Sequence, residues 1–294
     1  MTATDHAVLH RPVLDWYAEQ RRDLPWRSPG ATPWGVFVSE VMLQQTPVVR
    51  VLPVWTQWMT RWPTPADLAA AAPGDAVRHW GRLGYPRRAL RLHAAATAMV
   101  ASHDGAVPDD LEQLRALPGV GSYTAAAVGA FAFGIRCAVV DTNVRRVHAR
   151  CVTGSAQAAP ALTAAESRLA EELLPPDDAK AAVWNVAVME LGALVCTAAS
   201  PTCDRCPIAD RCAWVAAGRP AYDGPVKRAQ RWAGTDRQVR GLLLQALRDA
   251  DGPVEQARLD LVWADAAQRG RCLAGLIEDG LIDPLPDRAY ALPG

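Results

Sequence analysis

The chain has 294 residues, of which 50% are hydrophobic and 21% charged, and this balance excludes a disordered protein and indicates a globular one. No apolar run approaches the roughly 20 residues that cross a bilayer, and residues 1–12 lack the apolar centre of a secretory signal, so we expect a cytoplasmic protein. The net charge is zero, but net charge does not fix the local field, so basic patches are not excluded.

The first two-thirds of the sequence predicts one helix after another. Apolar residues recur there at three- and four-residue spacing, between breaks made of Pro, Gly and short polar clusters. The predicted helices are His10–Gln20, Pro33–Met59, Asp75–Ser102, Leu111–Ala116, Tyr123–Phe133, Thr142–Val152 and Leu162–Leu174. Because no alternating strand pattern persists, we expect an all-α body.

The composition changes after Trp214. Residues 217–234 are rich in Gly, Pro and Arg and predict a linker. The segments that follow predict helices over Asp236–Ala250, with Asp236 as the N-cap, over Glu255–Val262 and over Ala264–Asp279, and then a hairpin between Leu281 and Leu292. Three helices and a hairpin favour a small winged-helix module, and a plain helical cap is the alternative.

Arginine supplies almost all of the basic charge, and it clusters in two places. The clusters are Arg78, Arg82, Arg87, Arg88 and Arg91, and then Arg145, Arg146 and Arg150. A guanidinium group can fork onto phosphate oxygens, which would suit a nucleic-acid partner. The simpler interpretation is that these side chains form solvated helix faces.

The hairpin sequence Leu117-Pro118-Gly119-Val120-Gly121 separates two of the short helices. Glycine allows the backbone to turn tightly and to approach a partner closely. The free N–H groups at the start of the next helix favour a phosphate. We therefore expect Gly119, Val120, Gly121 and Ser122 to bind DNA, with an ordinary turn as the alternative.

Two carboxylates are candidates for chemistry. Glu40 lies inside an otherwise apolar helix, and Asp141 follows an apolar run. Each has a simpler explanation, since Glu40 would be an exposed helix charge and Asp141 a helix N-cap. Together they suit the cleavage of an N-glycosidic bond, in which one group protonates the leaving base and the other stabilises the sugar cation.

Four of the seven cysteines lie close together in the sequence. Cys196, Cys203, Cys206 and Cys212 have the spacing Cys-x6-Cys-x2-Cys-x5-Cys. In a cytosolic chain such a group indicates a metal centre rather than disulfides. Zinc more often takes two Cys-x2-Cys pairs, so a single pair with an outlying cysteine on each side favours a 4Fe–4S cluster, with zinc or four unrelated buried thiols as alternatives.

Taken in order, these features resemble the helix–hairpin–helix DNA glycosylase superfamily, of the iron–sulfur, endonuclease III-like type. Four motifs are similar to those of the adenine DNA glycosylases: Leu24-Pro25-Trp26-Arg27, Ser39-Glu40-Val41-Met42-Leu43-Gln44-Gln45-Thr46, Gly81-Arg82-Leu83-Gly84-Tyr85 and Met189-Glu190-Leu191-Gly192-Ala193. The match covers about residues 10–215. It implies a two-lobed, all-α fold with an N-terminal helix (1–29), a six-helix barrel (30–135) and an iron–sulfur lobe (136–216). Composition adds the linker (217–234) and the C-terminal module (235–294).

The resemblance also implies a substrate and a set of roles. The protein would act as a monomer on double-stranded DNA that holds adenine opposite 8-oxoguanine or guanine. Glu40 would protonate the flipped adenine, and Asp141 would stabilise or attack the sugar cation. Asn143 and Tyr123 would assist. The adenine pocket would be lined by Trp26, Arg27 and Glu190, and Gln45 and Tyr85 would wedge into the base stack around the vacated position, with Leu43 as a further substrate-binding residue. From the cysteine loop itself, we expect Arg205 and Arg211 to contact phosphates.

Position 123 distinguishes between relatives. Bifunctional members place a lysine there as an amine nucleophile, whereas this chain has Tyr123, and its two lysines are Lys180 and Lys227. We therefore expect base removal without strand cleavage. A thymine or uracil mismatch glycosylase is the alternative enzyme, and a non-enzymatic iron–sulfur DNA-binding protein is the alternative of another class.

The sequence departs from the family pattern in two places. Pro86 follows Tyr85 where the family often has a second tyrosine. Residues 225–294 are too short for the α/β domain with which the family reads 8-oxoguanine, so the sequence leaves open how the opposite base is recognised.

Overall fold

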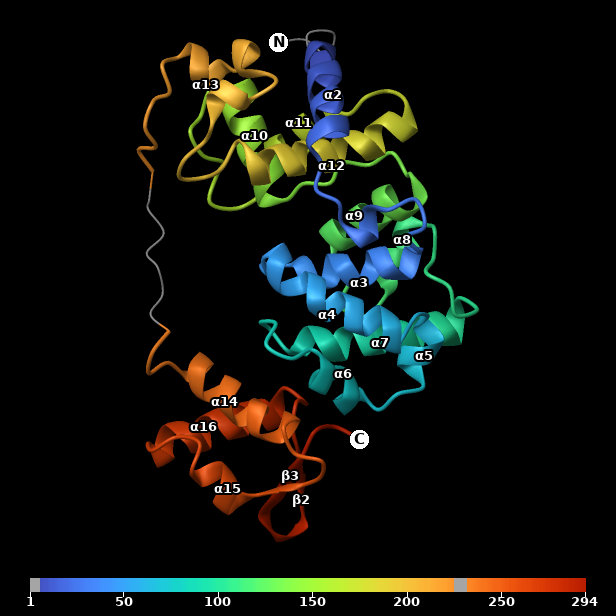
Figure 1. The fold of residues 1–294 in the computed structure, drawn as a ribbon, viewed down its shortest axis with the longest axis vertical. Coiled ribbons are helices and arrows are strands. Elements are labelled where there is room, and N and C mark those ends of the chain that lie inside the picture. Colours follow the sequence, from blue (N-terminus) through green and yellow to red (C-terminus); the bar gives the residue numbers. More distant parts are fainter. Residues whose placement is uncertain (1–5, 225–231) are drawn as a thin grey trace. The chain divides into compact units, whose positions relative to one another are not determined.

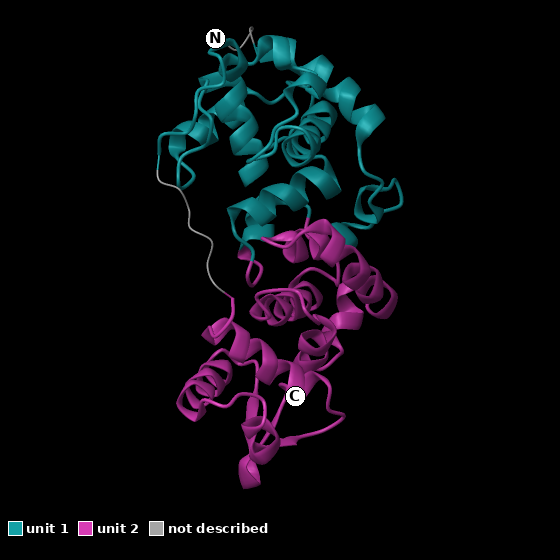
Figure 2. Ribbon diagram, turned by 60° about the vertical axis from the view of Figure 1, so that its left-hand side comes forward, with its two compact units in different colours: residues 1–36, 109–115, 120–225 teal, residues 37–108, 116–119, 226–294 magenta. Residues whose placement is uncertain are grey.

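The protein is described here by a computed structural model that covers residues 6–224 and 232–294, so part of the predicted linker lies outside the described residues. These residues form two compact units (Figures 1 and 2). Unit 1 comprises residues up to 36, 109–115 and 120–225, and unit 2 comprises 37–108, 116–119 and the residues from 226 onward. Among the described residues, no helix has both the length and the apolar character needed to cross a membrane.

Unit 1 is built around one long helix, α12 (Asp178–Leu194), against which α2 and α10 pack. Its other elements are a 3-10 turn (Ala7–Leu9), α2 (His10–Gln20), a 3-10 turn (Pro25–Arg27), α8 (Leu111–Ala116), α9 (Ser122–Phe133), α10 (Thr142–His148), α11 (Ala164–Glu172), two 3-10 turns (Cys203–Arg205 and Ala209–Arg211) and α13 (Ala213–Ala216). Asp177 caps α12 by accepting a hydrogen bond from the main-chain N–H of Lys180. The sequence analysis did not predict α12. Its own residues are apolar on almost every face, so they show no amphipathic stripe.

The helix predicted over Thr142–Val152 changes its hydrogen-bond pattern partway along. It is α-helical in α10 and then forms a π-helical turn, Ala149–Thr153, which Gly154 ends with a φ of +73°. π-helical turns are rare and frequent at functional sites. This turn lies between the predicted catalytic residue Asp141 and the cysteine loop.

Unit 2 contains α4 (Val48–Arg61), α5 (Pro65–Ala69), α6 (Pro73–His79) and α7 (Arg87–Ser102), and it receives the end of α3 (Pro33–Leu43), which begins in unit 1. The rings of Trp58 and Trp80, both fully buried, pack edge to face at 5.6 Å. α5, which was not predicted, is a short helix started by a capping box between Thr64 and Asp67.

Two of the predicted helices in this region were wrong in the same way. Pro33–Met59 is broken between α3 and α4, where Gln45 takes a φ of +56°, and Asp75–Ser102 is broken between α6 and α7, where Tyr85 takes a φ of +57°. Both breaks contain residues in the left-handed region, Gln45 in the first and Gly81 and Tyr85 in the second, and apolar periodicity does not report such residues.

The C-terminal module is a three-helix unit with a small sheet. Its elements are α14 (Asp236–Arg248), β1 (Val254–Glu255), α15 (Gln256–Asp260), α16 (Ala266–Glu278), β2 (Asp283–Leu285) and β3 (Ala289–Ala291). The antiparallel sheet has the order β1-β3-β2, with Tyr290 opposite both Val254 and Pro284. This order is that of a winged helix, as predicted, rather than of a plain helical cap.

One detail of this module differs from the prediction. Thr235, not Asp236, caps α14 by accepting a hydrogen bond from the main-chain N–H of Gln238. The Asp236 carboxylate pairs instead with Arg271, at 3.0 Å.

Three hydrogen bonds to main-chain carbonyls and one ion pair between side chains attach this module to α6 and α7 within unit 2. The contacts are Arg78 Nη1 to Ala250 O at 2.8 Å, Arg248 Nε to Val77 O at 2.9 Å, Gly74 N to Pro293 O at 2.7 Å and Arg87 Nη1 to Asp279 Oδ1 at 3.0 Å. A Cβ atom at Gly74 would lie 2.4 Å from Pro293 O, so glycine is needed for this approach.

We predict that Gly74→Ala weakens the attachment, because the new methyl group displaces Pro293 and breaks the hydrogen bond from the Gly74 N–H. Overpacking of this kind costs about 1–3 kcal/mol of unfolding free energy. Chemical denaturation measures the loss, and hydrogen exchange at the Gly74 amide locates it. Gly252→Ala is the matched control, since nothing lies within 4 Å of a Cβ there. Equal stability of the two variants would contradict the prediction.

Candidate active site

Asp141 lies at the N-terminus of α10 with both carboxylate oxygens hydrogen-bonded. Oδ1 accepts from the Val144 N–H at 2.7 Å, and Oδ2 accepts from Asn143 Nδ2 at 2.7 Å. Burial raises the pKa of the Asp141 carboxyl above its ordinary value, and these hydrogen bonds offset the rise only in part. Asp141 is thus the N-cap that its sequence context predicted and is also a fixed, largely desolvated carboxylate.

Asn143 is itself positioned from the far side by Arg146. Arg146 Nη2 donates to Asn143 Oδ1 at 2.8 Å and to Gly192 O at 2.6 Å, and its Nε donates to Cys196 O at 2.7 Å. A Cβ at Gly192 would lie 2.7 Å from Asn143 Cβ, so this glycine lets α12 approach α10. The pair Asp141–Asn143 is therefore fixed by the end of α12 and the first cysteine.

Asn185 supports the segment that leads into Asp141, and the sequence analysis missed it. It is buried, its Oδ1 accepts from the Val139 N–H at 3.0 Å, and its Nδ2 donates to Cys137 O at 2.9 Å. It satisfies two main-chain groups of an extended segment that lacks a strand partner. A polar residue within the apolar run of α12 was the signal that could have found it.

Tyr123 lies near the start of α9 and packs against the buried cluster of Ala127, Ala130 and Val139. Met189 packs against the same cluster. Tyr123 thus shares a cluster with Val139 and Met189, which are close in sequence to Asp141 and to the predicted pocket residue Glu190.

Glu190 is fully buried in α12 and forms ion pairs with two arginines. Arg22 donates through Nε at 2.8 Å and Nη2 at 2.6 Å, and Arg27 Nη1 lies 3.0 Å from Oε2. Burial alone would raise the pKa of Glu190, but the hydrogen bonds and charges of Arg22 and Arg27 outweigh it and lower the pKa to about 2. Trp26, also buried, lies on the same 3-10 turn as Arg27, so the structure brings the three predicted pocket residues into one region.

Arg22 is the member of this ion-pair network that the sequence analysis missed. A fully buried glutamate needs a cationic partner, and the one that donates most of the hydrogen bonds is 168 residues away in the sequence. The only local signal was that Arg21 and Arg22 precede the Leu24-Pro25-Trp26-Arg27 motif.

Glu40, Leu43, Gln45 and Tyr85 all lie in unit 2. Glu40 is 6% exposed on α3, so its interpretation as an exposed helix charge was wrong. Leu43 ends α3, and Gln45 and Tyr85 are the non-glycine residues in the left-handed region at the helix breaks, both exposed at the surface. Such conformations cost about 1–3 kcal/mol each and are often part of a functional site.

The hairpin between α8 and α9 is exposed at Pro118, Gly119, Gly121 and Ser122. Gly119 has a φ of +78°, and a Cβ there would lie 2.7 Å from Arg91 Cβ, so this position requires glycine. Gly121 differs from the expectation, because it is the N-cap of α9 with an ordinary extended backbone and needs no left-handed turn. No side chain caps α9 at Gly121, so its first N–H groups suit an anion.

The four predicted ligand cysteines belong to one apolar cluster in unit 1. Cys212 is buried within this cluster, and Cys196, Cys203 and Cys206 pack against it. Arg150 Nη1 lies 3.4 Å from Cys196 Sγ, and Cys212 Sγ donates to Arg150 O at 3.5 Å. Over the described residues, no group of three or more His, Cys, Asp or Glu side chains is close enough together to hold a metal ion.

The solvated interpretation was wrong for several of the clustered arginines. Arg88, Arg146 and Arg150 are each 9% exposed or less and donate to main-chain carbonyl groups. Arg145, also largely buried, binds the carbonyls of Ala159 and Ala161. These arginines are structural donors inside the protein rather than a charged surface.

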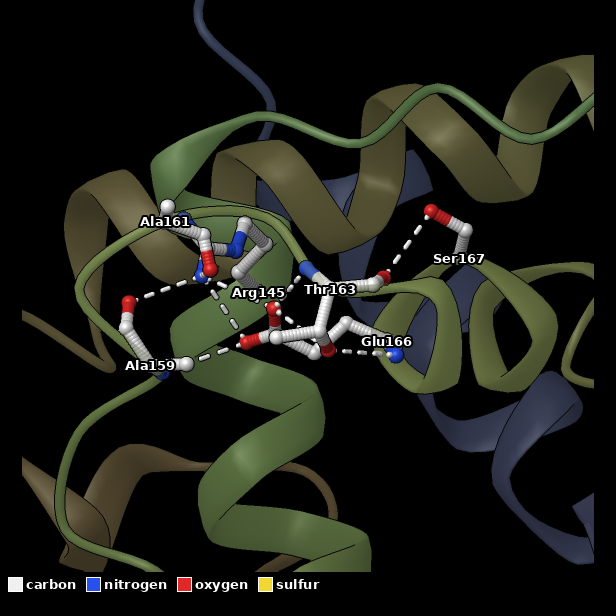
Figure 3. Close-up of polar contacts among 6 residues, drawn as sticks. All are labelled: Arg145, Ala159, Ala161, Thr163, Glu166 and Ser167. Carbon is white, nitrogen blue, oxygen red and sulfur yellow. Dashed lines mark hydrogen bonds and ion pairs between the residues drawn. The ribbon is translucent and has the colours of Figure 1, made fainter.

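Figure 3 shows how Arg145 attaches the loop before α11 to α10. Its Nη2 donates to both carbonyls and to Glu166 at 2.8 Å, while Thr163 and Glu166 form a capping box at the start of α11. A pocket of about 110 Å³ lies beside this network. None of the predicted site residues lines it, so we assign it no part in the chemistry.

Known proteins match this arrangement over most of the chain. Residues 38–175 match the family described as the HhH-GPD superfamily base excision DNA repair protein. The adenine DNA glycosylase of Mycobacterium tuberculosis (strain ATCC 25618 / H37Rv) is 53% identical over 96% of this chain and 92% of its own length, and that of Homo sapiens is 41% identical over 68% of this chain and 38% of its own.

Solved structures agree with this match. A thermostable thymine-DNA glycosylase has a TM-score of 0.65 at 27% identity, covering 73% of this chain and 98% of its own. Endonuclease III in a trapped covalent complex with DNA has a TM-score of 0.63 at 21% identity, covering 75% and 100%, which shows the fold.

Fold and motifs together define a base excision DNA repair glycosylase of the helix–hairpin–helix type. Within that superfamily, the chain belongs to the family of the adenine DNA glycosylases.

We predict that Glu190→Gln lowers the unfolding free energy at pH 7 by about 3 kcal/mol, because a fall in pKa from the ordinary 4.5 to about 2 is worth about 1.4 kcal/mol per pH unit. The folded-state pKa is depressed, so this stabilisation is present above pH 4.5 and is lost as the pH falls toward 2. Denaturation at a series of pH values should show the wild type and the variant converging over that range. Glu112→Gln, which removes an exposed carboxylate on α8, is the control. A pH-independent gap would show that the Glu190 charge does not provide the stability.

Proposed function

We propose that this glycosylase hydrolyses the N-glycosidic bond of adenine mispaired with 8-oxoguanine or guanine in double-stranded DNA. It would act as a monomer in the cytoplasm and leave an abasic site. The observation that carries the proposal is the Asp141 carboxylate, which is largely desolvated and fixed on both oxygens at the start of α10. Relatives named adenine DNA glycosylase that are 53% identical over nearly the whole chain support adenine as the base.

The proposed reaction divides the work between two carboxyl groups. When the bond between the anomeric carbon and the adenine nitrogen breaks, its electron pair goes to the base, and Glu40 supplies the proton that makes adenine a neutral leaving group. The sugar is left as an oxocarbenium-like cation, which the negative charge of Asp141 stabilises directly or by adding to it. A water then adds its oxygen to the anomeric carbon, breaking the bond to Asp141 where that carboxylate has added, and its proton goes to the Glu40 carboxylate, so the products are adenine and an abasic site.

Asn143 and Tyr123 assist without exchanging protons in this scheme. Asn143 donates to Asp141 Oδ2 and so keeps this oxygen oriented while the cation forms. Tyr123 occupies the position where bifunctional relatives carry a lysine. A phenol forms no Schiff base with the sugar, so the strand is expected to remain intact.

The adenine would lie against Trp26, Arg27 and Glu190. A buried indole offers a flat face for stacking a flipped base. Both oxygens of Glu190 already accept from arginine, so we expect Glu190 to fix the orientation of Arg27 in the pocket rather than to exchange protons. Leu43, Gln45 and Tyr85 would fill the position that the base leaves.

The cysteine loop fits a 4Fe–4S cluster by its chemistry. Four soft thiol ligands pack against the same apolar core, and Arg150 lies within 3.4 Å of the first of them. Cys196, Cys203, Cys206 and Cys212 would hold the cluster. When bound, it would act as a structural cross-link of the loop that presents Arg205 and Arg211, both exposed, for contact with phosphates.

A thymine or uracil mismatch glycosylase is the second candidate. The structural similarity to a thymine-DNA glycosylase favours it, but only at 27% identity. The higher identity to the mycobacterial enzymes makes adenine the first choice.

We predict single-turnover release of adenine from duplexes with A:8-oxoG and A:G pairs, and strand cleavage only after alkali. Asp141→Asn should slow this release at least about 100-fold, because it removes the charge that stabilises the cation and leaves the N-cap in place. Gel analysis with and without alkali distinguishes the two products.

A duplex with a T:G pair is the specificity control. Release of thymine without adenine would favour the second candidate, and binding of all duplexes without release of any base would overturn both. Strand cleavage without alkali would contradict the role assigned to Tyr123.

We predict that Arg205→Ala reduces the slope of log K against log salt by about 0.9, the value for one phosphate contact on duplex DNA. The purified variant should keep the iron and sulfide content of the wild type, about four of each per chain. Arg168→Ala, at an exposed position of α11, is the matched control and should leave the slope unchanged. An unchanged slope for Arg205→Ala would show that this arginine does not contact a phosphate. Zinc in place of iron in the purified wild-type protein would contradict the proposed 4Fe–4S cluster.

A further inference from the structure

Gln45 and Tyr85 share an unusual conformation. They have φ angles of +56° and +57°, and each lies in a short segment between two helices, Gln45 between α3 and α4 and Tyr85 between α6 and α7. Both are exposed, and the Tyr85 ring is half accessible to solvent. Side chains that bear a Cβ take this conformation only when their surroundings impose it.

One residue, Arg88, contacts the segments of both. Its Nη1 donates to the carbonyl of Gln44, the peptide that leads directly into Gln45. Its guanidinium carbon lies 4.4 Å from the centroid of the Tyr85 ring, in a cation–π contact. The Arg88 N–H also donates to Tyr85 O at 3.0 Å, so the contact with Tyr85 involves main chain and side chain.

The Arg88 guanidinium is buried without a carboxylate partner in the part of the chain that the structure describes, and this burial is unfavourable. It is 9% exposed, and it takes part in none of the ion pairs found among the described residues. Burial accordingly lowers its pKa. Uncompensated burial of a charge is unfavourable, so the benefit of Arg88 is to be sought in the two segments that it joins.

Neighbouring contacts support the same connection. Thr46 Oγ1 donates to Gln44 O at 3.3 Å, so the Gln44 carbonyl accepts from two side chains. Arg50, on α4, donates to Arg82 O in the segment before Tyr85. The loop after α3 is therefore bound by an arginine of α7, and the loop after α6 is bound by an arginine of α4.

We propose that Arg88 is a positioning residue that fixes Gln45 and Tyr85 as a single rigid unit. The inference rests on the proposed function, in which these two residues enter the base stack when adenine leaves it. With Arg88 in place, the two side chains would insert together, and the ordering would be complete before DNA binds. Lysine would not substitute, because it lacks the planar group that stacks on a ring while donating to a carbonyl.

The test uses the full-length protein with Arg88→Ala, Arg88→Lys and the matched control Arg87→Ala. Arg87 is the neighbouring arginine on α7, half exposed and paired with Asp279, so its loss removes the same charge without touching Gln44 or Tyr85. The probe is a duplex with 2-aminopurine in place of the target adenine, whose fluorescence rises when the base is unstacked. Single-turnover base release and thermal unfolding are measured beside it.

We expect Arg88→Ala to reduce the fluorescence rise by at least about half and to slow base release at saturating enzyme by about 10- to 100-fold, the range for a misplaced catalytic geometry. Arg88→Lys should remain impaired although it keeps the charge. In a Tyr85→Ala background, Arg88→Ala should cost less than it does in the wild type, because the contact with that ring is already lost and only the hydrogen bond to Gln44 O remains to be removed. Arg87→Ala should match the wild type in fluorescence and rate.

Three results would overturn the inference: an Arg88→Ala variant equal to Arg87→Ala, an Arg88→Lys variant equal to the wild type, or fully multiplicative effects of Arg88→Ala and Tyr85→Ala. Should Arg88→Ala fail to fold, Arg88→Lys and Thr46→Val are compared with Arg87→Ala in its place. Thr46→Val removes the other side-chain hydrogen bond to Gln44 O, so it should reduce the fluorescence rise more than Arg87→Ala does. Fluorescence reports unstacking rather than chemistry, so a wild type that unstacks the base without releasing it contradicts the proposed function alone. A wild type that gives no rise contradicts the wedge and, with it, the role of Arg88.

Discussion

Guanidinium groups that donate to main-chain carbonyls connect segments of this protein that are distant in sequence. Arg146 binds the carbonyls of Gly192 and Cys196, Arg150 binds those of Ala156 and Thr197, and Arg136 binds that of Pro175. When a buried arginine binds a carbonyl group, only one charge loses its water. When it binds a buried carboxylate, two charges lose their water. The five donors of arginine also let one side chain bind several carbonyls at once. The near-absence of lysine agrees with this use, because an ammonium group lacks the planar fork.

The same interaction explains how α10 contacts both the Asp141 carboxylate and the cysteine loop. Its start presents Asp141 and Asn143, and one turn later Arg146 donates to Cys196 O, where the cysteine loop begins. Arg150, in the π-helical turn after α10, lies beside Cys196 Sγ. The geometry of the carboxylate is therefore connected to that of the cysteine loop through side chains on one helix. The π-helical turn follows directly and places Arg150 over the ring of Trp214, at 4.7 Å.

The sequence could predict those parts of the site that depend on local chemistry. Asp141 before Thr-Asn-Val is a helix N-cap in the structure, and Gly119 has the positive φ that a tight hairpin requires. Partners from distant parts of the chain could not be predicted. The sequence around Glu190 does not indicate that Arg22 is its partner, and the sequence around Gln44 does not indicate Arg88. The helix breaks near Gln45 and Tyr85 were also missed, although Pro47 lies in the first and Gly81, Gly84 and Pro86 lie in the second, because apolar residues recur at helical spacing on both sides of each break.

Charge alone was a poor guide to burial. Arg88, Arg146 and Arg150 belong to clusters that composition would place at the surface, yet they lie inside, and Glu40 is buried where an exposed carboxylate was the simpler expectation. In the C-terminal module, the choice between a winged helix and a helical cap depended on β1, a strand of two residues that no periodicity can reveal.

The contact between Gly74 and Pro293 has a consequence for the order in which the chain acquires its structure. Gly74 lies in the first turn of α6, and the carbonyl that accepts from its N–H belongs to a residue that the ribosome adds more than two hundred positions later. Arg78 likewise donates to the carbonyl of Ala250, which is also synthesised much later. During synthesis, α6 therefore emerges with unsatisfied main-chain and side-chain donors, and unit 2 is completed only after all of unit 1 has been translated.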